Sequence, residues 1–104
     1  MQETNFKLTE AAGTTACAVL IRPAASADGT RIIRFQANAA GDLVASEPLA
    51  LGRYFIEWVM FGAQGGTVEI AITDAANKPL RSTIKDKNET GQAFKWNANE
   101  FTVK

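Results

Sequence analysis

Short runs of alternating apolar and polar side chains make up most of this chain. The run from 67 to 73 is typical, with Val68, Ile70 and Ile72 on one side and polar or small residues between them. Glycine, proline, asparagine and aspartate interrupt such runs at intervals of about eight to twelve residues. An alternation of period two is typical of a strand with one buried face. The pattern therefore predicts an all-β protein.

We expect short strands at 6–8, 16–22, 31–38, 42–46, 53–62, 67–73, 80–84, 94–96 and 101–103. Glu47 and Pro48 should end the strand at 42–46, and a short helical turn is compatible with the residues around Leu49. We also expect a turn at Asn97–Asn99. Strands of this number and length favour a compact antiparallel β-sandwich (jelly-roll-like) or a small β-barrel, and the sequence fits both. A chain of 104 residues has the size of a single domain, which we place at 1–104.

The glycine-rich segment 62–66 separates the two most regular runs. Its sequence is Gly-Ala-Gln-Gly-Gly. Glycine adopts the positive φ angles that tight connections between paired strands require. We therefore predict that 53–62 and 67–73 form an antiparallel hairpin.

The run from Arg53 to Gly62 is apolar on both of its faces. Alternation places Tyr54, Ile56, Trp58 and Met60 on one face and Arg53, Phe55, Glu57, Val59 and Phe61 on the other. Either the strand is covered on both sides within its own chain, or one face meets another subunit or a ligand. Glu57 stands among apolar neighbours, so we expect it to pair with Arg34 or Arg53 or to face solvent.

Composition argues against several classes of function. Lysine plus arginine and aspartate plus glutamate each number 11, so the chain lacks the basic excess typical of nucleic-acid binding. Histidine is absent, which removes the commonest general base and zinc ligand. The single cysteine, Cys17, lies in an apolar run, where we expect an inert buried thiol. We predict no enzymatic activity and no cofactor.

The segment Asp86–Gly91 matches the opening of a calcium-binding loop. The bidentate glutamate that completes such a loop would fall at position 97, which is Asn97. An ordinary turn explains the segment equally well. Calcium binding there stays an open alternative, and we predict no other metal site.

The chain shows neither a signal peptide near Met1 nor an apolar run long enough to span a membrane, so we expect a cytoplasmic protein. The favoured hypothesis is a non-catalytic binding or assembly module, acting as a homo-oligomer or on another protein, of the accessory or phage and virion structural kind. The alternative is a small ligand-binding domain, most plausibly for carbohydrate, that uses Trp96 and its polar neighbours or the exposed side of Arg53–Phe61. Neither a nucleic acid nor a membrane is an expected partner. The candidate interaction surface consists of Tyr54, Phe55, Glu57, Trp58, Phe61, Trp96, Asn97 and Asn99.

Overall fold

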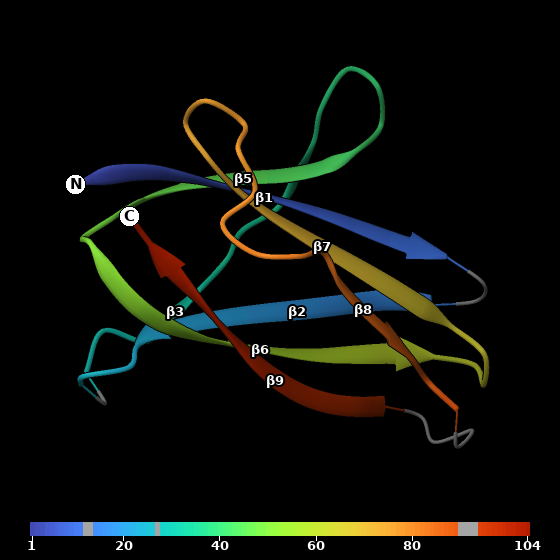
Figure 1. Ribbon diagram of the computed structural model, residues 1–104. Coiled ribbons are helices and arrows are strands. Elements are labelled where there is room, and N and C mark those ends of the chain that lie inside the picture. Colours follow the sequence, from blue (N-terminus) through green and yellow to red (C-terminus); the bar gives the residue numbers. More distant parts are fainter. Residues whose placement is uncertain (12–13, 27, 90–93) are drawn as a thin grey trace.

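The structure is a computed structural model that describes residues 1–11, 14–26, 28–89 and 94–104 (Figure 1). These residues form two antiparallel sheets that pack face to face, with no helix among them. The prediction of an all-β fold is therefore confirmed, and of the two expected alternatives the structure is the sandwich. No helix in the described part of the chain could cross a membrane.

Sheet A has the strand order β4-β5-β1-β7-β8, and sheet B has the order β3-β2-β6-β9. The strands of sheet A are β1 (Gln2–Ala11), β4 (Gln36–Ala37), β5 (Leu43–Leu49), β7 (Thr67–Asp74) and β8 (Ile84–Lys87). Those of sheet B are β2 (Thr14–Pro23), β3 (Arg31–Ile32), β6 (Gly52–Gly62) and β9 (Phe94–Val103). The long strands β1 and β6 lie in the interior of their sheets, and β9 forms one edge of sheet B (Figure 1).

The core lies between the two sheets and follows the alternation of the sequence. The inward residues of β1, β2, β6 and β7 are nearly all buried, and they include Phe6, Leu8, Val19, Ile21, Ile56, Trp58, Met60, Val68, Ile70 and Ile72. Phe101 of β9 stacks on Tyr54 at 5.4 Å between ring centroids and meets Phe6 edge-on at 5.9 Å. Aromatic pairs in these geometries add stabilisation beyond the area they bury. The two ring contacts also hold the C-terminal end of β9 against β6 in its own sheet and against β1 in sheet A.

The predicted hairpin between residues 53–62 and 67–73 is wrong. β6 belongs to sheet B and β7 to sheet A, where β7 pairs with β1 and β8. The intervening loop carries the chain from one sheet to the other. Its backbone is held by the end of β8, because the Gly65 N–H donates to Asn88 O at 2.7 Å and the Asn88 N–H donates to Gly66 O at 2.8 Å. Gly65 has the expected positive φ, 89°, but a crossover needs that conformation as much as a hairpin does.

Three other predicted elements also differ. The run 31–38 is divided between β3 and β4, which lie in different sheets. β5 continues through Pro48 without a helical turn near Leu49, because β4 pairs only with Leu43 and Val44 and leaves an open edge where the missing N–H is tolerated. The expected strand at 80–84 begins at Ile84 instead, as β8.

β9 is one continuous strand, so the expected turn at Asn97–Asn99 is also wrong. It pairs with β6 from Gly52 opposite Val103 to Phe61 opposite Phe94. Asn97 and Asn99 are therefore strand residues of sheet B.

Candidate functional site

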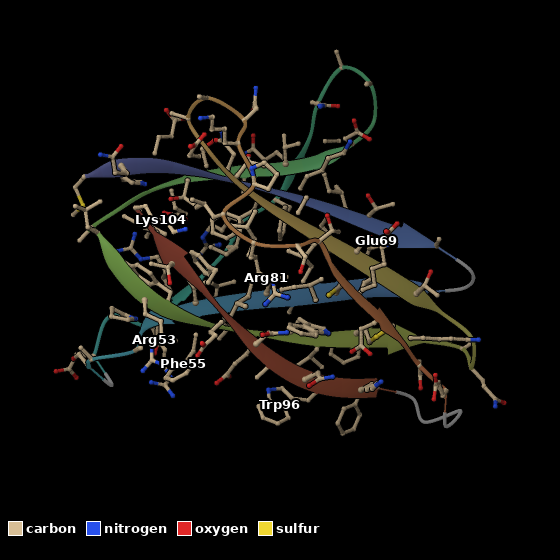
Figure 2. The ribbon with its side chains drawn as sticks, viewed as in Figure 1. Arg53, Phe55, Glu69, Arg81, Trp96 and Lys104 are labelled. Carbon is tan, nitrogen blue, oxygen red and sulfur yellow. The ribbon has the colours of Figure 1, made fainter. Side chains whose placement is uncertain are left out.

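The outer faces of the two sheets differ in chemistry. The outer face of sheet A is mostly polar, with Asn5, Lys7, Thr9, Ser46, Glu69, Thr73 and Lys85 on it. The outer face of sheet B is mostly apolar and carries Ala16, Ala18, Leu20, Ile32, Phe55, Val59, Phe61, Phe94, Trp96 and Ala98. Figure 2 shows Phe55 and Trp96 on the side of sheet B that is turned away from sheet A. Exposed apolar patches are common at interaction surfaces, which makes this face the candidate site.

The aromatic patch, which we define as Phe61, Phe94 and Trp96, consists of exposed aromatic side chains at one end of this face. Phe61 lies opposite Phe94 in the β6–β9 register, and Val59 lies opposite Trp96. The exposed fractions are 43% for Phe61, 56% for Phe94 and 57% for Trp96. The β6–β9 ladder therefore brings together three rings that the core does not cover.

The other end of the outer face is cationic. The guanidinium of Arg22 lies 4.6 Å from the centroid of the Phe55 ring, and that of Arg53 lies 5.7 Å from it. Arg53 also pairs with Glu100 at 3.6 Å. Since both partners of this pair are more than half exposed, it contributes little stability.

Glu57 lies between these two ends. It faces Leu20 and Ala98 in the register of the sheet and is half-buried. Within the described part of the chain it forms no ion pair with Arg34 or Arg53, so of the two expected alternatives the structure agrees with a carboxylate that faces outward. The carboxylate is directed to the outer face.

Tyr54 and Trp58 do not belong to the interaction surface predicted for them. They are exposed by only 6% and 2%, respectively. The Tyr54 hydroxyl donates to Ala50 O at 2.9 Å, and the Trp58 Nε1–H donates to Oδ2 of Asp86 at 2.8 Å. Both side chains point inward, and these bonds satisfy their polar atoms inside the sandwich.

Asn97 and Asn99 are exposed, but they lie on the opposite face of β9 from Trp96. Their Oδ1 atoms accept hydrogen bonds from the backbone N–H of Ala98 and Glu100 at 2.8 and 2.9 Å. The structure therefore brings together Phe55, Glu57, Phe61 and Trp96 of the predicted surface and separates the two asparagines from them. Phe94 and Ile32 complete the exposed apolar set, and Phe94 shares the parity of Trp96 in the sequence.

Asp86, the first residue of the predicted calcium loop, has partners within the protein. Its carboxylate accepts hydrogen bonds from Trp58, from Nζ of Lys95 at 2.7 Å and from the backbone N–H of Lys87 at 2.8 Å. Partial burial acts to raise the pKa of Asp86, but these hydrogen bonds and the charge of Lys95 outweigh it and hold the pKa below its usual value. Positions 90 and 91 of the predicted loop lie outside the described residues. Elsewhere, no cluster of three or more residues suited to bind a metal is formed by the side chains that the structure describes.

The thiol of Cys17 is partly buried on the core side of β2. Burial, with smaller contributions from Glu10 and Asp86, raises the pKa of Cys17 to about 12. Because the thiolate is the reactive form, this environment makes the thiol a poor nucleophile.

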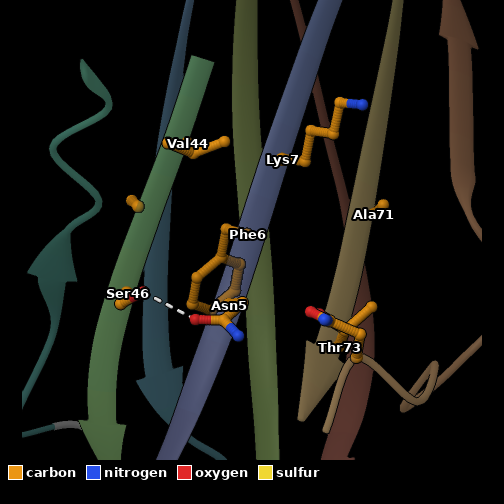
Figure 3. A pocket seen from close by; sticks show the side chains of 9 residues that line it. Asn5, Phe6, Lys7, Val44, Ser46, Ala71 and Thr73 are labelled. Carbon is orange, nitrogen blue, oxygen red and sulfur yellow. Dashed lines mark hydrogen bonds between the residues drawn. The ribbon is translucent and has the colours of Figure 1, made fainter. Parts of the chain in front are cut away.

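A shallow hollow of about 310 Å³ lies on the outer face of sheet A (Figure 3). Ser46 Oγ donates to Asn5 Oδ1 at 2.6 Å, and Asn5 Nδ2 donates to Asp74 O at 3.3 Å. Two polar side chains of the hollow, Ser46 and Asn5, are thus already engaged in hydrogen bonds within the protein. This leaves the outer face of sheet B as the stronger candidate site.

The chain matches no protein-family model, and no curated protein or solved structure is significantly similar to it. The fold and the site thus define a β-sandwich with one polar and one apolar outer face.

Proposed function

We propose that this protein is a non-catalytic assembly module that binds a second copy of itself through the aromatic patch. The observation that carries the proposal is the exposure of Phe61, Phe94 and Trp96 side by side on one end of a sheet face. Aromatic residues are enriched at protein interfaces because they bury a large apolar area at a low cost in side-chain entropy. Covering the patch would remove this area from water.

The dimensions and charge of the molecule support such an association. Its principal extents are 39 × 33 × 21 Å, so the broad faces have room for the roughly 800 Å² per partner of a standard interface. The net charge is zero, so two copies meet without long-range repulsion.

Carbohydrate binding is the second candidate, because the exposed ring of Trp96 could stack on a sugar. A sugar site also needs polar groups beside the ring to bind hydroxyls. The immediate neighbours of Trp96 on its own face are Val59, Phe94 and Ala98, and the nearby asparagines face the other way. Glu57 is a diagonal neighbour across β6 and supplies a single carboxylate. This mostly apolar setting favours a protein surface over a sugar as the partner.

Solution mass tests the proposal. We expect size-exclusion chromatography with light scattering, over a tenfold range of concentration, to show a dimer or larger oligomer that Trp96→Lys converts to monomer. Phe61→Lys should act in the same direction. Thr9→Lys is the matched control, since Thr9 is exposed on the outer face of sheet A opposite Glu69.

A monomer at every concentration would contradict self-assembly. If the monomer then bound oligosaccharides with a change in tryptophan fluorescence, the second candidate would replace the first. An oligomer that tolerates both substitutions on the aromatic patch would place the interface elsewhere.

A further inference from the structure

The edges of the two sheets are not equally protected. An edge strand presents unpaired N–H and C=O groups that can pair with another strand, and short edge strands limit this. Three of the edges are short, since β3 and β4 have 2 residues each and β8 has 4. β9 is an edge strand of 10 residues. It is therefore the longest of the four outermost strands.

Alternate residues of β9 turn their backbone groups away from β6. The carbonyl of Glu100 accepts a hydrogen bond from Nη1 of Arg81 at 2.9 Å, so this residue faces the open edge. In an antiparallel ladder every second residue has the same orientation. Phe94, Trp96, Ala98 and Thr102 therefore also direct their N–H and C=O outward.

The second half of this edge is blocked by side chains. The outward N–H of Ala98 donates a hydrogen bond to Asn97 Oδ1, and that of Glu100 donates to Asn99 Oδ1. Arg81 occupies the carbonyl of Glu100. These contacts satisfy edge groups that would otherwise pair with a further strand.

The first half of the edge is open. Among the residues that the structure describes, none forms a hydrogen bond to the outward N–H or C=O of Trp96. The open backbone coincides with two rings of the aromatic patch, Phe94 and Trp96. The same segment thus offers unpaired backbone groups for hydrogen bonding and exposed rings for burial against a partner.

We propose that two copies associate by antiparallel pairing of their β9 edges about Trp96, which joins both copies of sheet B into one continuous sheet. This inference rests on the proposed self-association and specifies its geometry. Centred on Trp96, the pairing places the two Trp96 residues opposite each other and Phe94 opposite Ala98 of the partner copy. Large rings then lie beside small side chains, and the Trp96 pair forms a cross-strand aromatic contact.

Charge is compatible with this register. It places Lys95 opposite Asn97 of the partner copy, so no like charges face each other across the interface between the two β9 strands. The Lys95 ammonium is already held by Asp86 within its own chain at 2.7 Å. A two-fold axis through Trp96 lets the same surface serve both partners, and the zero net charge allows a second copy to approach without long-range repulsion, so we take the occupant to be a second copy.

Ala98→Pro tests the pairing without disturbing β6–β9, because the N–H it removes faces outward and proline is tolerated at such edge positions. We expect it to weaken dimerisation about tenfold or more, because the proline ring would project from the edge toward Phe94 of the partner copy, and the two-fold axis makes this obstruction occur twice. Thr102→Pro is the matched control, because its outward N–H lies beyond the paired segment. It should leave the dimerisation constant within about twofold, and circular dichroism should confirm that both variants are folded.

Amide hydrogen exchange gives an independent measurement. In the wild-type protein we expect the N–H groups of Phe94 and Trp96 to become protected as concentration rises through the association range, whereas the Ala98 N–H is already bonded to Asn97 Oδ1. An oligomer in which these amides stay unprotected, and which tolerates Ala98→Pro, would overturn edge pairing and leave self-association intact. A monomer throughout would overturn both.

Discussion

The indole Nε1–H of Trp58 donates a 2.8 Å hydrogen bond to Oδ2 of Asp86, and this bond connects sheet B to sheet A. Oδ1 of the same carboxylate accepts a 2.7 Å hydrogen bond from Lys95 of β9. At the other side of the sandwich, Arg31 of β3 pairs with Glu47 of β5 at 3.3 Å. Polar bridges therefore connect the two layers at both sides of the apolar core.

Trp58→Phe should destabilise the protein by about 2–4 kcal/mol. The substitution removes a hydrogen bond to a charged group and leaves unfilled space in a buried site. Urea unfolding at a concentration where the protein is monomeric measures this loss. Trp96→Phe is the control, and it should change stability by no more than about 0.5 kcal/mol, because Trp96 is exposed. Equal effects of the two substitutions would show that the bond to Asp86 contributes nothing.

The contribution of Asp86 should disappear in acid. Its pKa is lower in the folded protein than in the unfolded chain, so the charged carboxylate stabilises the fold at pH values above its ordinary pKa of about 4. This stability is lost as the pH falls below about 4 and through the lowered folded pKa. The difference in unfolding free energy between wild type and Asp86→Asn should therefore be larger at pH 6 than at pH 2.

Asp42→Asn provides the comparison for that experiment. The Asp42 ion pair with Lys7 is exposed on both sides, so its loss should change stability by less than about 1 kcal/mol at either pH. An Asp86→Asn penalty that does not shrink in acid would contradict the assigned role of the carboxylate.

The sequence predicted the fold class and the division of β6 into two faces, because alternation depends only on the geometry of a strand. It could not predict which face lies inside, since both faces are rich in aromatic residues. Tyr54 and Trp58 were therefore assigned to a surface, although their neighbours Ile56 and Met60 have the same parity and are also buried. The choice between the faces is made by contacts with sheet A, which are distant in sequence.

Strand partners were less predictable than strands. The glycines of 62–66 indicate a change of direction, but a hairpin and a crossover between sheets use the same positive φ. The prediction of a turn at Asn97–Asn99 is wrong for a related reason. Asparagine favours turns because its side chain bonds nearby backbone groups, and in β9 it makes such bonds at an open sheet edge.

Gly66→Ala should destabilise the protein by about 1–3 kcal/mol. A Cβ at this position would lie 2.6 Å from Oγ1 of Thr14, which is closer than real contacts allow, and 3.0 Å from the backbone N of Thr14, which is tighter than most real contacts. In a Thr14→Ala background the penalty should be smaller, because the nearest atom is gone while the backbone contact stays. Urea unfolding of the two single variants and the double variant gives the coupling energy. A penalty that is equal in both backgrounds would exclude the clash as its cause.

Thr4→Val should stabilise the protein by about 1 kcal/mol. Thr4 is fully buried in β1, and its Oγ1 has no hydrogen-bond partner among the residues that the structure describes. A buried hydroxyl without a partner loses its hydration without compensation, and a methyl group of similar size avoids this cost. Thr4→Ser is the matched control, since it keeps the hydroxyl and removes the methyl group, and it should destabilise. Thermal or urea unfolding measures both variants, and a valine variant that is less stable than wild type would show that the hydroxyl is satisfied in solution.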